Sequence, residues 1–584
     1  MSGQGSIDQP ELRQALAVSR SSFISTGVFS FFINILMLAP ILYMREVYDR
    51  VLASNSESTL LMLTLLLVFL FLVMGALEWV RSQVLIVTGA RLEKMLGPRV
   101  FESLFGQTLA SGGQLATTQP LNDLLTLRQF LGGAALITLF DSPWLPIYLG
   151  LLFMFHPLMG AVGLFAAVVL IALAIANERV TRDHLKEANK LHIQNNQDTQ
   201  RNLRNSEVVE AMGMLPRLRE RWQARQDDLL ALQTRASRKG GLVATSSKTF
   251  RMMMQSLMLG VGAYLAIQGE ISGGLLIAGS LLLGRALAPV DHMIGSWKSF
   301  LSAREAYGRL HELLEAQPAF DPPMSLPPPR GEIRFEHATV MPAGARAPIL
   351  KNIDLVIEPG TSVAVIGPSA AGKSSLVRAI LGIHPTVHGA IRLDGAEIAH
   401  WNRAELGEHI GYLPQDVELL EGTVAENIAR FGEVLDPRMV IAAATAAGVH
   451  EMILQLPEGY KTPVGGSVLS AGQRQRIGLA RALYGNPRLV VLDEPNSNLD
   501  TLGDRALAKA IKQLRKQGST VIVVTHRNNI LELVDKILLL NNGEVVAYDD
   551  RRNVKAMLNG GGASITHEKP DRESLVRASS KRKS

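Results

Sequence analysis

The sequence predicts a multidomain chain: an all-α domain with six transmembrane helices, followed by an α/β domain built around a phosphate-binding loop. Three observations predict this fold class. Apolar runs long enough to span a bilayer cluster in the first half of the chain. From Gly331 onward, short β-rich runs alternate with helical ones, as in a largely parallel sheet. The run Gly367–Ser374 matches the pattern G-x-x-x-x-G-K-[ST] at every fixed position.

The composition agrees with an apolar part joined to an ordinary soluble part. The chain has 584 residues, enough for two or three domains. Its mean hydropathy of +0.16 is high for a chain with 19% charged residues. A net charge of +6 fits either nucleic-acid binding or the cytoplasmic loops of a membrane protein. The lack of cysteine excludes disulfides, thiolate metal sites and a cysteine peptidase. No cleavable signal peptide is evident in the polar N-terminal stretch.

We expect six membrane spans in the first half of the chain. The third is the least regular, because Asp141, Pro143 and Pro146 interrupt it. The fourth follows it almost at once, so this pair should form a tight hairpin. The six spans are Phe23–Met44, Thr59–Val80, Leu131–Phe155, Pro157–Ala176, Phe250–Gln268 and Gly274–Val290.

The distribution of Lys and Arg orients these spans. Both are frequent after the second and the fourth span, and both are absent between spans three and four and between spans five and six. The positive-inside rule therefore places the N-terminus, both long loops and the C-terminal half in the cytoplasm. Arg45 and Arg50, in the loop after the first span, run against this pattern, with acidic residues beside them. The segment from Glu178 to Arg235 is predicted to be two long helices with a turn at Ala211–Pro216.

These patterns divide the chain into five segments. Six prolines between Pro318 and Pro329 indicate an extended linker, and the Gly-, Ser- and Lys-rich end indicates a disordered tail. The segments are a cytoplasmic N-terminal segment (1–22), a transmembrane domain (23–305), a Pro-rich linker (306–330), a nucleotide-binding domain (331–558) and a basic tail (559–584).

The phosphate-binding loop lies between a strand-like run, Ser362–Ile366, and a helix-like run, Ser375–Ile380. In that context the backbone N–H groups at the helix N-terminus can cradle phosphate oxygens. Lys373 can reach the terminal phosphates, and Ser374 can bind Mg²⁺. The predicted nucleotide contacts are Gly367, Pro368, Ser369, Ala370, Ala371, Gly372, Lys373, Ser374 and Ser375.

A second apolar run, Leu489–Leu492, ends in two carboxylates. A buried strand would deliver Asp493 to the Mg²⁺ shell, and Glu494 could orient and polarise the attacking water. A strand that merely ends in acidic residues is the alternative. Because this run follows a phosphate-binding loop in the sequence, the catalytic interpretation is favoured.

Four further motifs stand in order around these two, and the set resembles the ATP-binding cassette (ABC) ATPases. Leu469–Gln473 resembles the LSGGQ signature, with Ala471 in place of the first glycine. Gln415 resembles the Q-loop glutamine, Ser497–Asp500 the D-loop and His526 the switch histidine. The resemblance covers almost all of the second domain.

The resemblance implies a role for each motif, with ATP and Mg²⁺ as cofactors. Glu494 would be the general base, Asp493 and Ser374 would hold Mg²⁺, and His526 would contact the γ-phosphate. Gln415 would sense the γ-phosphate and take part in the metal site. Ser470 and Gly472 of the signature would bind the γ-phosphate of the ATP held by a second copy, so the chain would function as a homodimer. The signature and the D-loop together add five expected nucleotide-binding residues. These residues are Ser470, Ala471, Gly472, Gln473 and Asp500.

Two segments depart from the family pattern. Cassettes often place an aromatic residue upstream of the phosphate-binding loop to stack on adenine, and Thr339–Gly344 contains none. Exporters often carry a glutamate just before the signature, and Thr462–Val468 has no carboxylate. Both departures leave the local contacts open.

The order of spans before cassette resembles exporters, and several segments look like bacterial type I secretion ATPases. They are Phe140–Tyr148, Asn205–Met214, Gly284–Pro289 and Glu494–Asp500. This resemblance implies an inner-membrane exporter, with the ATPase domain in the cytoplasm. Its partners would be a periplasmic adaptor, an outer-membrane channel and a secreted polypeptide with a C-terminal signal. A lipid, peptide or drug half-transporter is the alternative.

Two other functions and one structural question stay open at this point. A soluble ABC ATPase acting on DNA would fit the basic charge, although six apolar runs favour the lipid bilayer over nucleic acid. An ATP-gated channel is the other alternative. Asp141 and Arg285 are costly in hydrocarbon, so each either lines a translocation route or forms a structural pair.

Overall fold

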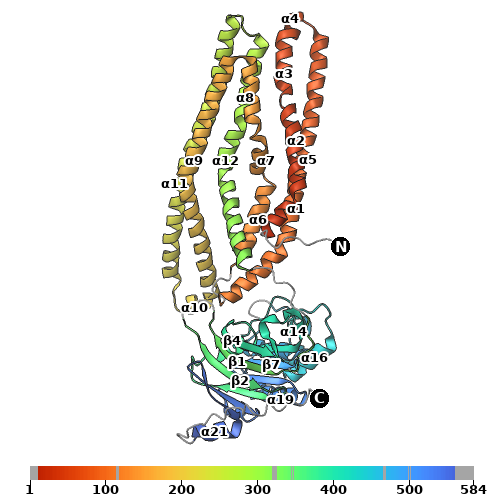
Figure 1. The fold of residues 1–584 in the computed structure, drawn as a ribbon, viewed down its shortest axis with the longest axis vertical. Helices are drawn as coiled ribbons and strands as arrows, with labels where there is room; N and C mark the ends of the chain where they lie inside the picture. The colour runs from red at the N-terminus through yellow and green to blue at the C-terminus, as the bar shows by residue number, and fades with distance from the viewer. Residues whose placement is uncertain are drawn as a thin grey trace, which may run out of the picture. The chain divides into compact units, whose positions relative to one another are not determined.

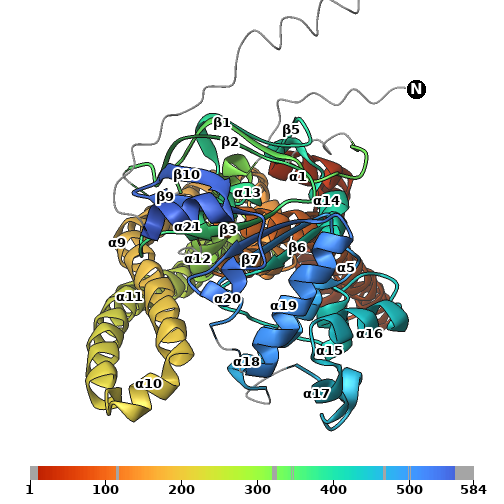
Figure 2. The ribbon, with the colours of Figure 1, turned by 90° about the horizontal axis from the view of Figure 1, so that it is seen from below.

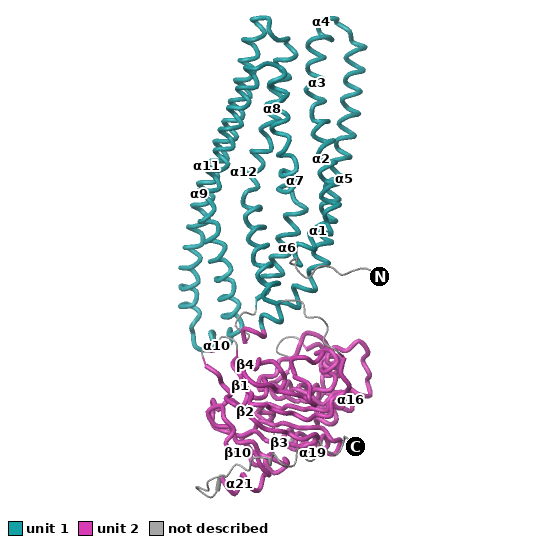
Figure 3. The backbone as a smooth tube through the Cα atoms, viewed as in Figure 1, with its two compact units in different colours: residues 1–108, 113–319 teal, residues 109–112, 320–584 magenta. Residues whose placement is uncertain are grey.

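The computed structural model describes residues 11–112, 117–317, 325–342, 345, 347–464, 469–497, 499 and 501–559. It divides into two compact units: residues 1–108 with 113–319, and residues 109–112 with 320–584 (Figure 3). The first unit is helical, and the second combines sheets with helices, which confirms the predicted fold class. The N-terminal ten residues, Asp500 and the predicted basic tail beyond Asn559 lie outside the described residues.

Among the described residues, five helical segments are long and apolar enough to cross a membrane. Each covers one predicted span, except that the last residue of the fifth, Gln268, falls just beyond its helix. A bent pair of helices, α6 (Gln119–Leu131) and α7 (Ala134–Asp141), raises the number to six if it counts as one span. The five segments are Arg20–Ser54, α5 (Glu57–Ala110), α9 (Pro157–Arg204), α11 (Leu215–Ile267) and α12 (Gly273–Ala316) (Figure 1).

The first span is built from several short pieces. After α1 (Glu11–Val18), the pieces are α2 (Arg20–Leu36), α3 (Ala39–Glu46), the π-helix η1 (Val47–Val51) and α4 (Leu52–Ser54). Asp49 of η1 accepts hydrogen bonds from the Ser272 hydroxyl at 2.6 Å and from the Gly274 N–H at 2.8 Å. A carboxylate there satisfies the free N–H groups at the start of α12, and so joins the ends of two spans.

The third predicted span is not one continuous helix. It is divided into α7 and α8 (Trp144–Phe155), with Ser142 and Pro143 between them. Proline has no N–H to donate and its ring clashes with the preceding turn, which accounts for the break. The predicted hairpin is confirmed, since only His156 separates α8 from α9. The His156 ring caps α9 by accepting a hydrogen bond from the Leu158 N–H at 3.1 Å.

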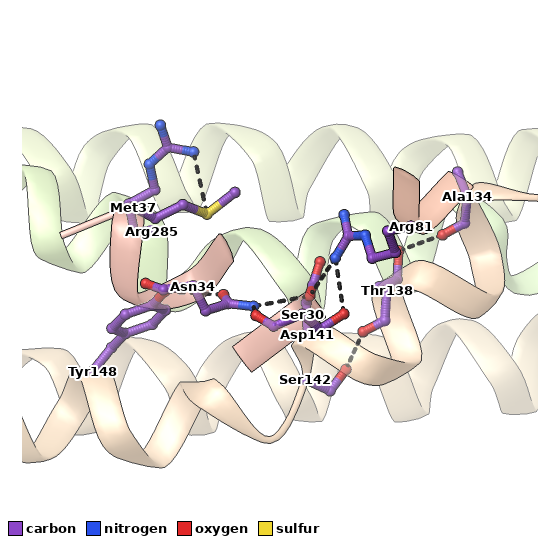
Figure 4. Close-up of polar contacts among 10 residues, drawn as sticks. All are labelled: Ser30, Asn34, Met37, Arg81, Ala134, Thr138, Asp141, Ser142, Tyr148 and Arg285. Atoms are coloured by element: carbon purple, nitrogen blue, oxygen red, sulfur yellow. Dashed lines mark hydrogen bonds and ion pairs between the residues drawn. The ribbon is translucent and has the colours of Figure 1, made fainter. Parts of the chain in front are cut away.

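The break in the third span lies beside a polar network that joins three spans (Figure 4). Arg81 of α5 is only 5% exposed and donates to Asp141 at 3.1 Å and to the Ser30 hydroxyl at 2.9 Å. Asn34 donates to the same Asp141 carboxylate at 2.9 Å and accepts from the Tyr148 hydroxyl. Asp141 is therefore one half of a buried ion pair, which favours the structural alternative for this residue.

Arg285 has a different environment. Its side chain is exposed on α12, and one of its guanidinium nitrogens lies 4.0 Å from the sulfur of Met37 (Figure 4). Asp141 pairs with Arg81 and not with Arg285. The two polar residues that sequence analysis grouped together thus lie in separate settings.

The long cytoplasmic helices predicted after the fourth span are present. Helices α9 and α11 run side by side, and the short helix α10 (Ser206–Ala211) joins them (Figure 2). Asn195 of α9 donates to Gln226 of α11 at 3.1 Å, and Arg225 pairs with Asp198. The turn lies where Gly213 adopts a left-handed conformation, at φ 61°, which suits a residue without a Cβ.

Helix α12 continues to Ala316, so the first residues of the expected linker, 306–316, are helical. Ala306, Leu310 and Leu313 recur at helical spacing, and all three are buried in a core shared with α1, α5 and α6. At the same end, Arg309 donates two hydrogen bonds to Asp123 of α6, at 2.7 and 2.8 Å. This packing explains why α12 continues beyond the end of the predicted membrane span.

The second unit contains two sheets. The four-stranded sheet is antiparallel, in the order β2 (Leu350–Ile357), β1 (Ile333–Val340), β4 (Thr386–Leu393), β5 (Ala396–Glu397). The six-stranded sheet has the order β10 (Glu544–Asp550), β9 (Lys536–Asn541), β3 (Ser362–Ile366), β8 (Thr520–Val524), β7 (Leu489–Asp493), β6 (Ile410–Leu413). Adjacent strands of this sheet are parallel, except that β10 is antiparallel to β9.

Side chains on the two faces of the six-stranded sheet are buried in separate hydrophobic cores. Val363, Leu489 and Val491 pack with α13 (Lys373–Ile380) and the antiparallel sheet. Val490 and Leu492 point to the opposite face of β7 and pack with α18 (Ala471–Leu483). Successive side chains of a strand point to opposite faces, so α13 and α18 cover opposite faces of the six-stranded sheet.

The remaining helices of this unit are short except for the 16-residue α19, and most surround these two cores (Figures 1 and 2). They are α14 (Arg403–His409), α15 (Val424–Ile428), α16 (Pro437–Ala446), α17 (His450–Leu454), α19 (Thr501–Lys516), α20 (Asn528–Leu531) and α21 (Arg551–Asn559).

Candidate functional site

Four neighbouring parallel strands bring the predicted catalytic motifs to one edge of the sheet. β3 ends at the phosphate-binding loop, β7 at Asp493, β8 just before His526, and β6 two residues before Gln415. Parallel strands end at the same edge of a sheet, and ligands of open α/β sheets bind there. Four motifs that are distant in the sequence therefore meet.

The phosphate-binding loop has the backbone shape that its glycines permit. Gly367, Ala370 and Gly372 all have positive φ angles, of 155°, 63° and 99°. A Cβ at Gly367 would lie 2.2 Å from the Leu540 carbonyl oxygen, so only glycine fits at this position. Gly372 caps α13, whose first N–H groups face the loop and favour an anion.

Lys373 is buried and lies against its own loop. Its ammonium donates to the carbonyl oxygens of Gly367 at 2.8 Å and Pro368 at 2.9 Å. The charge is thereby held inside the curve of the loop, where phosphate oxygens would be its partners. Ser374 and Ser375 follow on the first turn of α13, half-buried.

Asp493 is 2% exposed at the end of β7, and its Oδ1 atom has no hydrogen-bond partner among the residues that the structure describes. Burial raises the pKa of this carboxyl group, with a smaller contribution from the charge of Glu494. A hydrogen bond from Ser374 and the charges of Arg378 and Lys373 act in the opposite direction. A buried carboxylate oxygen without a partner beside a serine hydroxyl fits Mg²⁺, which prefers oxygen ligands.

Glu494 lies between two of the predicted catalytic residues. Its carboxylate accepts a hydrogen bond from the Gln415 side chain at 3.0 Å, and the His526 ring nitrogen is 3.9 Å from its other oxygen. The residue has a left-handed backbone, with φ 48°, and its N–H donates to the Val524 carbonyl at 3.0 Å. The fold thus brings Gln415, Glu494 and His526 together.

The signature motif forms the start of α18. The Ser470 hydroxyl accepts from the Gln473 N–H at 3.2 Å, and the Gln473 side chain accepts from the Ser470 N–H at 2.8 Å. This reciprocal capping box leaves Ser470 and Ala471 exposed, with Gly472 half-buried. The helix N-terminus is therefore presented outward, where an anion would be favoured.

The signature and the phosphate-binding loop do not meet within one chain. The loop opens α13 and the signature opens α18, and these helices pack on opposite faces of the sheet. Of the predicted D-loop, Ser497 is described, and Asp500 lies outside the described residues. The part upstream of the phosphate-binding loop, Thr339 to Pro342, contains no aromatic residue, as the sequence predicts.

Sequence analysis missed Gln475. Its side chain is 1% exposed and donates to the carbonyl oxygen of Pro495 at 2.7 Å, and more weakly to the Ser497 hydroxyl at 3.3 Å. A signal was available, because Gln475 occupies the apolar face of α18 together with Leu479 and Ala482. A polar residue on a buried helical face requires a buried partner.

Comparisons with known proteins agree with this geometry. Residues 350–497 match the family described as "ABC transporter", and residues 23–289 match "ABC transporter transmembrane region". The chain is 44% identical over 542 residues to the type I secretion system ATP-binding protein PrsD of Rhizobium meliloti (strain 1021), covering 92% of this chain and 93% of that protein.

Two more distant relatives are toxin translocation proteins. The leukotoxin translocation ATP-binding protein LktB of Mannheimia haemolytica is 29% identical, over 93% of this chain and 77% of its own length. The toxin RTX-I translocation ATP-binding protein of Actinobacillus pleuropneumoniae is 27% identical over the same shares.

A solved structure extends the likeness to the whole fold. A bacterial Atm1-family ABC exporter with ATP bound superposes with a TM-score of 0.78 and 22% identity, covering 94% of this chain and 100% of that one. The family matches agree with the membrane spans and the cassette motifs, and the relative from Rhizobium meliloti aligns over nearly its whole length. The chain belongs to the ABC transporters, as a membrane-spanning ATPase of the type I secretion family.

Proposed function

We propose that this protein uses ATP to export an unfolded polypeptide across the bacterial inner membrane, for example a repeat-bearing protease. The observation that carries the proposal is the 44% identity, over 92% of the chain, to a type I secretion protein with the same order of spans and cassette. The toxin-translocating relatives support a protein cargo over a lipid or a drug.

The nucleotide site is proposed to be shared between two copies of the chain. One copy supplies Lys373, Ser374, Asp493 and Glu494, which lie at one edge of the sheet. The other supplies Ser470 and Gly472, because α18 lies on the opposite face of its own sheet and presents them outward. ATP held between the copies would close a homodimer, and hydrolysis would release it.

Hydrolysis is assigned to Glu494 as the base that accepts a proton from the attacking water. Gln415 at 3.0 Å and His526 at 3.9 Å hold the carboxylate between them, and each can also approach the γ-phosphate. Lys373 and the N–H groups that open α13 would bind the phosphates. Mg²⁺, held by Asp493, Ser374 and Gln415, would neutralise charge on the phosphate oxygens.

The family also suggests the partners. A periplasmic adaptor and an outer-membrane channel would continue the route, and a C-terminal signal would identify the cargo. The genes beside this one test that assignment, since an adaptor, a channel and a repeat-bearing protein are expected there.

A Lys373→Ala strain tests the function directly. Removing the ammonium that would bind phosphate should abolish secretion of the cargo while the protein remains in the membrane at its normal level. The measurement is the amount of cargo in the culture medium, with a Lys351→Ala strain as the control for loss of a lysine outside the loop. Unchanged secretion in the Lys373→Ala strain would contradict ATP-driven export and favour a gated channel. Efflux of a lipid or drug with no protein cargo would favour the half-transporter.

A further inference from the structure

Gln475 connects the two halves of the catalytic machinery that belong to different nucleotide sites. It lies in the second turn of α18, five residues after the helix cap Ser470. Its amide nitrogen lies 2.7 Å from the Pro495 carbonyl oxygen, 3.3 Å from the Ser497 hydroxyl and 3.4 Å from the Glu494 carbonyl oxygen. The side chain is 1% exposed, so these contacts are made out of water.

The residues that Gln475 contacts form the turn after β7. Within this turn the Ser497 N–H donates to the Glu494 carbonyl at 3.2 Å. Glu494 has φ 48°, a conformation that a residue with a Cβ adopts only when its surroundings hold it there. The Gln475 amide is therefore one of the groups that keep the Glu494 backbone in place, and with it the direction of the carboxylate.

We propose that Gln475 is a positioning residue for ATP hydrolysis: its amide fixes the Glu494 turn to the helix that presents the signature to the second nucleotide. Docking of Ser470 and Gly472 on the partner's ATP would then change the position of Glu494 in the same chain. The change would pass through Gln475, which lies little more than one helical turn after Ser470 and is bonded to the Glu494 turn. Gln475 itself contacts neither ATP nor the attacking water. This inference rests on the proposed role of Glu494 as the base and on the shared site.

The chemistry of the side chain makes the proposal specific. The three contacts of the Gln475 nitrogen given above are all to oxygen atoms, and two of these are carbonyl oxygens that can only accept. An amide nitrogen has two hydrogens to donate, whereas a carboxylate has none. Gln475→Glu keeps the size of the side chain and removes both donors, so it should be at least as harmful as Gln475→Ala.

The first test measures steady-state hydrolysis by the full-length dimer in lipid nanodiscs. Gln475→Ala should lower kcat about tenfold, the effect of losing one or two buried hydrogen bonds in the reacting geometry, with KM for ATP within about twofold. Ser519→Ala is the matched control, since its buried hydroxyl donates to the Pro487 carbonyl at 2.7 Å, just before the same strand β7. Equal losses in the two variants would reduce Gln475 to a packing contact and overturn the proposal.

The second test separates the Glu494 turn from the signature helix. In a Glu494→Gln background the proposed base is missing and ATP should not be hydrolysed. The amount of ATP that stays with the dimer during gel filtration then measures how well the signature docks on the nucleotide. Adding Gln475→Ala should leave retention within about twofold, because the capping box of Ser470 and Gln473 does not involve Gln475. Loss of retention would show that Gln475 supports the signature helix instead. Wild-type turnover by Glu494→Gln alone would refute the base, and hence the proposed function, whatever Gln475→Ala does.

Discussion

At the scale of single residues, Asp493 bears the clearest electrostatic cost. Burial raises its pKa, and within the described part of the chain its Oδ1 atom has no hydrogen-bond partner. The folded pKa lies above the unfolded one, so the contribution of Asp493 to stability is full below the unfolded pKa and lost as pH rises through the folded value. Above the unfolded pKa the buried carboxyl group of Asp493 therefore destabilises the fold, and a bound cation would offset this cost.

Asp493→Asn should consequently raise the melting temperature of the cassette at pH 7 without nucleotide, while abolishing hydrolysis. Each kcal/mol of repulsion removed should shift Tm by about 2–4 °C in a unit of this size. The measurement is a thermal melt with and without Mg²⁺ and ATP. Glu494→Gln, at a more exposed position, is the control and should change Tm little. A lower Tm for Asp493→Asn would contradict the account of this residue.

At the scale of elements, the Arg81–Asp141 pair joins α5 to the broken third span, with Ser30 and Asn34 of α2 attached to it (Figure 4). Arg81 is 5% exposed, so Asp141→Ala would leave a buried charge without its partner. Breaking such a pair costs about 3–5 kcal/mol, whereas replacing both members by apolar residues is often neutral.

Asp141→Ala should therefore lower Tm strongly in detergent, and the double variant Arg81→Met, Asp141→Leu should restore much of the loss. Arg285→Met, at the exposed arginine of α12, is the control and should leave Tm nearly unchanged. Thermal melts with secretion assays would check this. Normal Tm with lost secretion for Asp141→Ala would instead place Asp141 on the translocation route.

The same elements show what a sequence can and cannot predict. Lys373, Asp493 and Glu494 were predictable because their motifs are local and end buried strands. The pairing of Arg81 with Asp141 was not, because 60 residues separate them and only packing of the spans brings them together. The break at Pro143 was visible as a proline, but whether a span bends or breaks there depends on its neighbours. Gln475 was overlooked because its partners lie in the turn after β7, 19 to 22 residues further along the chain.

At the scale of the whole molecule, the chain is a multi-pass inner-membrane ABC transporter with its ATPase domain in the cytoplasm. Its cassette brings the predicted catalytic residues to one edge of the six-stranded sheet, and the helix that carries the signature packs on the face opposite to α13. We therefore propose that a single chain does not enclose ATP by itself, and that two copies related by symmetry form two shared sites.

Mixed dimers of two differently tagged chains test that claim most directly. Lys373→Ala inactivates the phosphate-binding loop of a chain, and Gly472→Glu places a negative charge where its signature would meet phosphate. With the two changes on different chains, one shared site keeps a normal loop and a normal signature. With both on one chain, neither site is intact.

ATP hydrolysis by the purified mixed dimers is the measurement. If the site is shared, the dimers hydrolyse ATP when the changes lie on different chains and show background rates when both changes lie on the same chain. The reverse order, with hydrolysis only when both changes share one chain, would show that each chain builds its own site and would contradict the account.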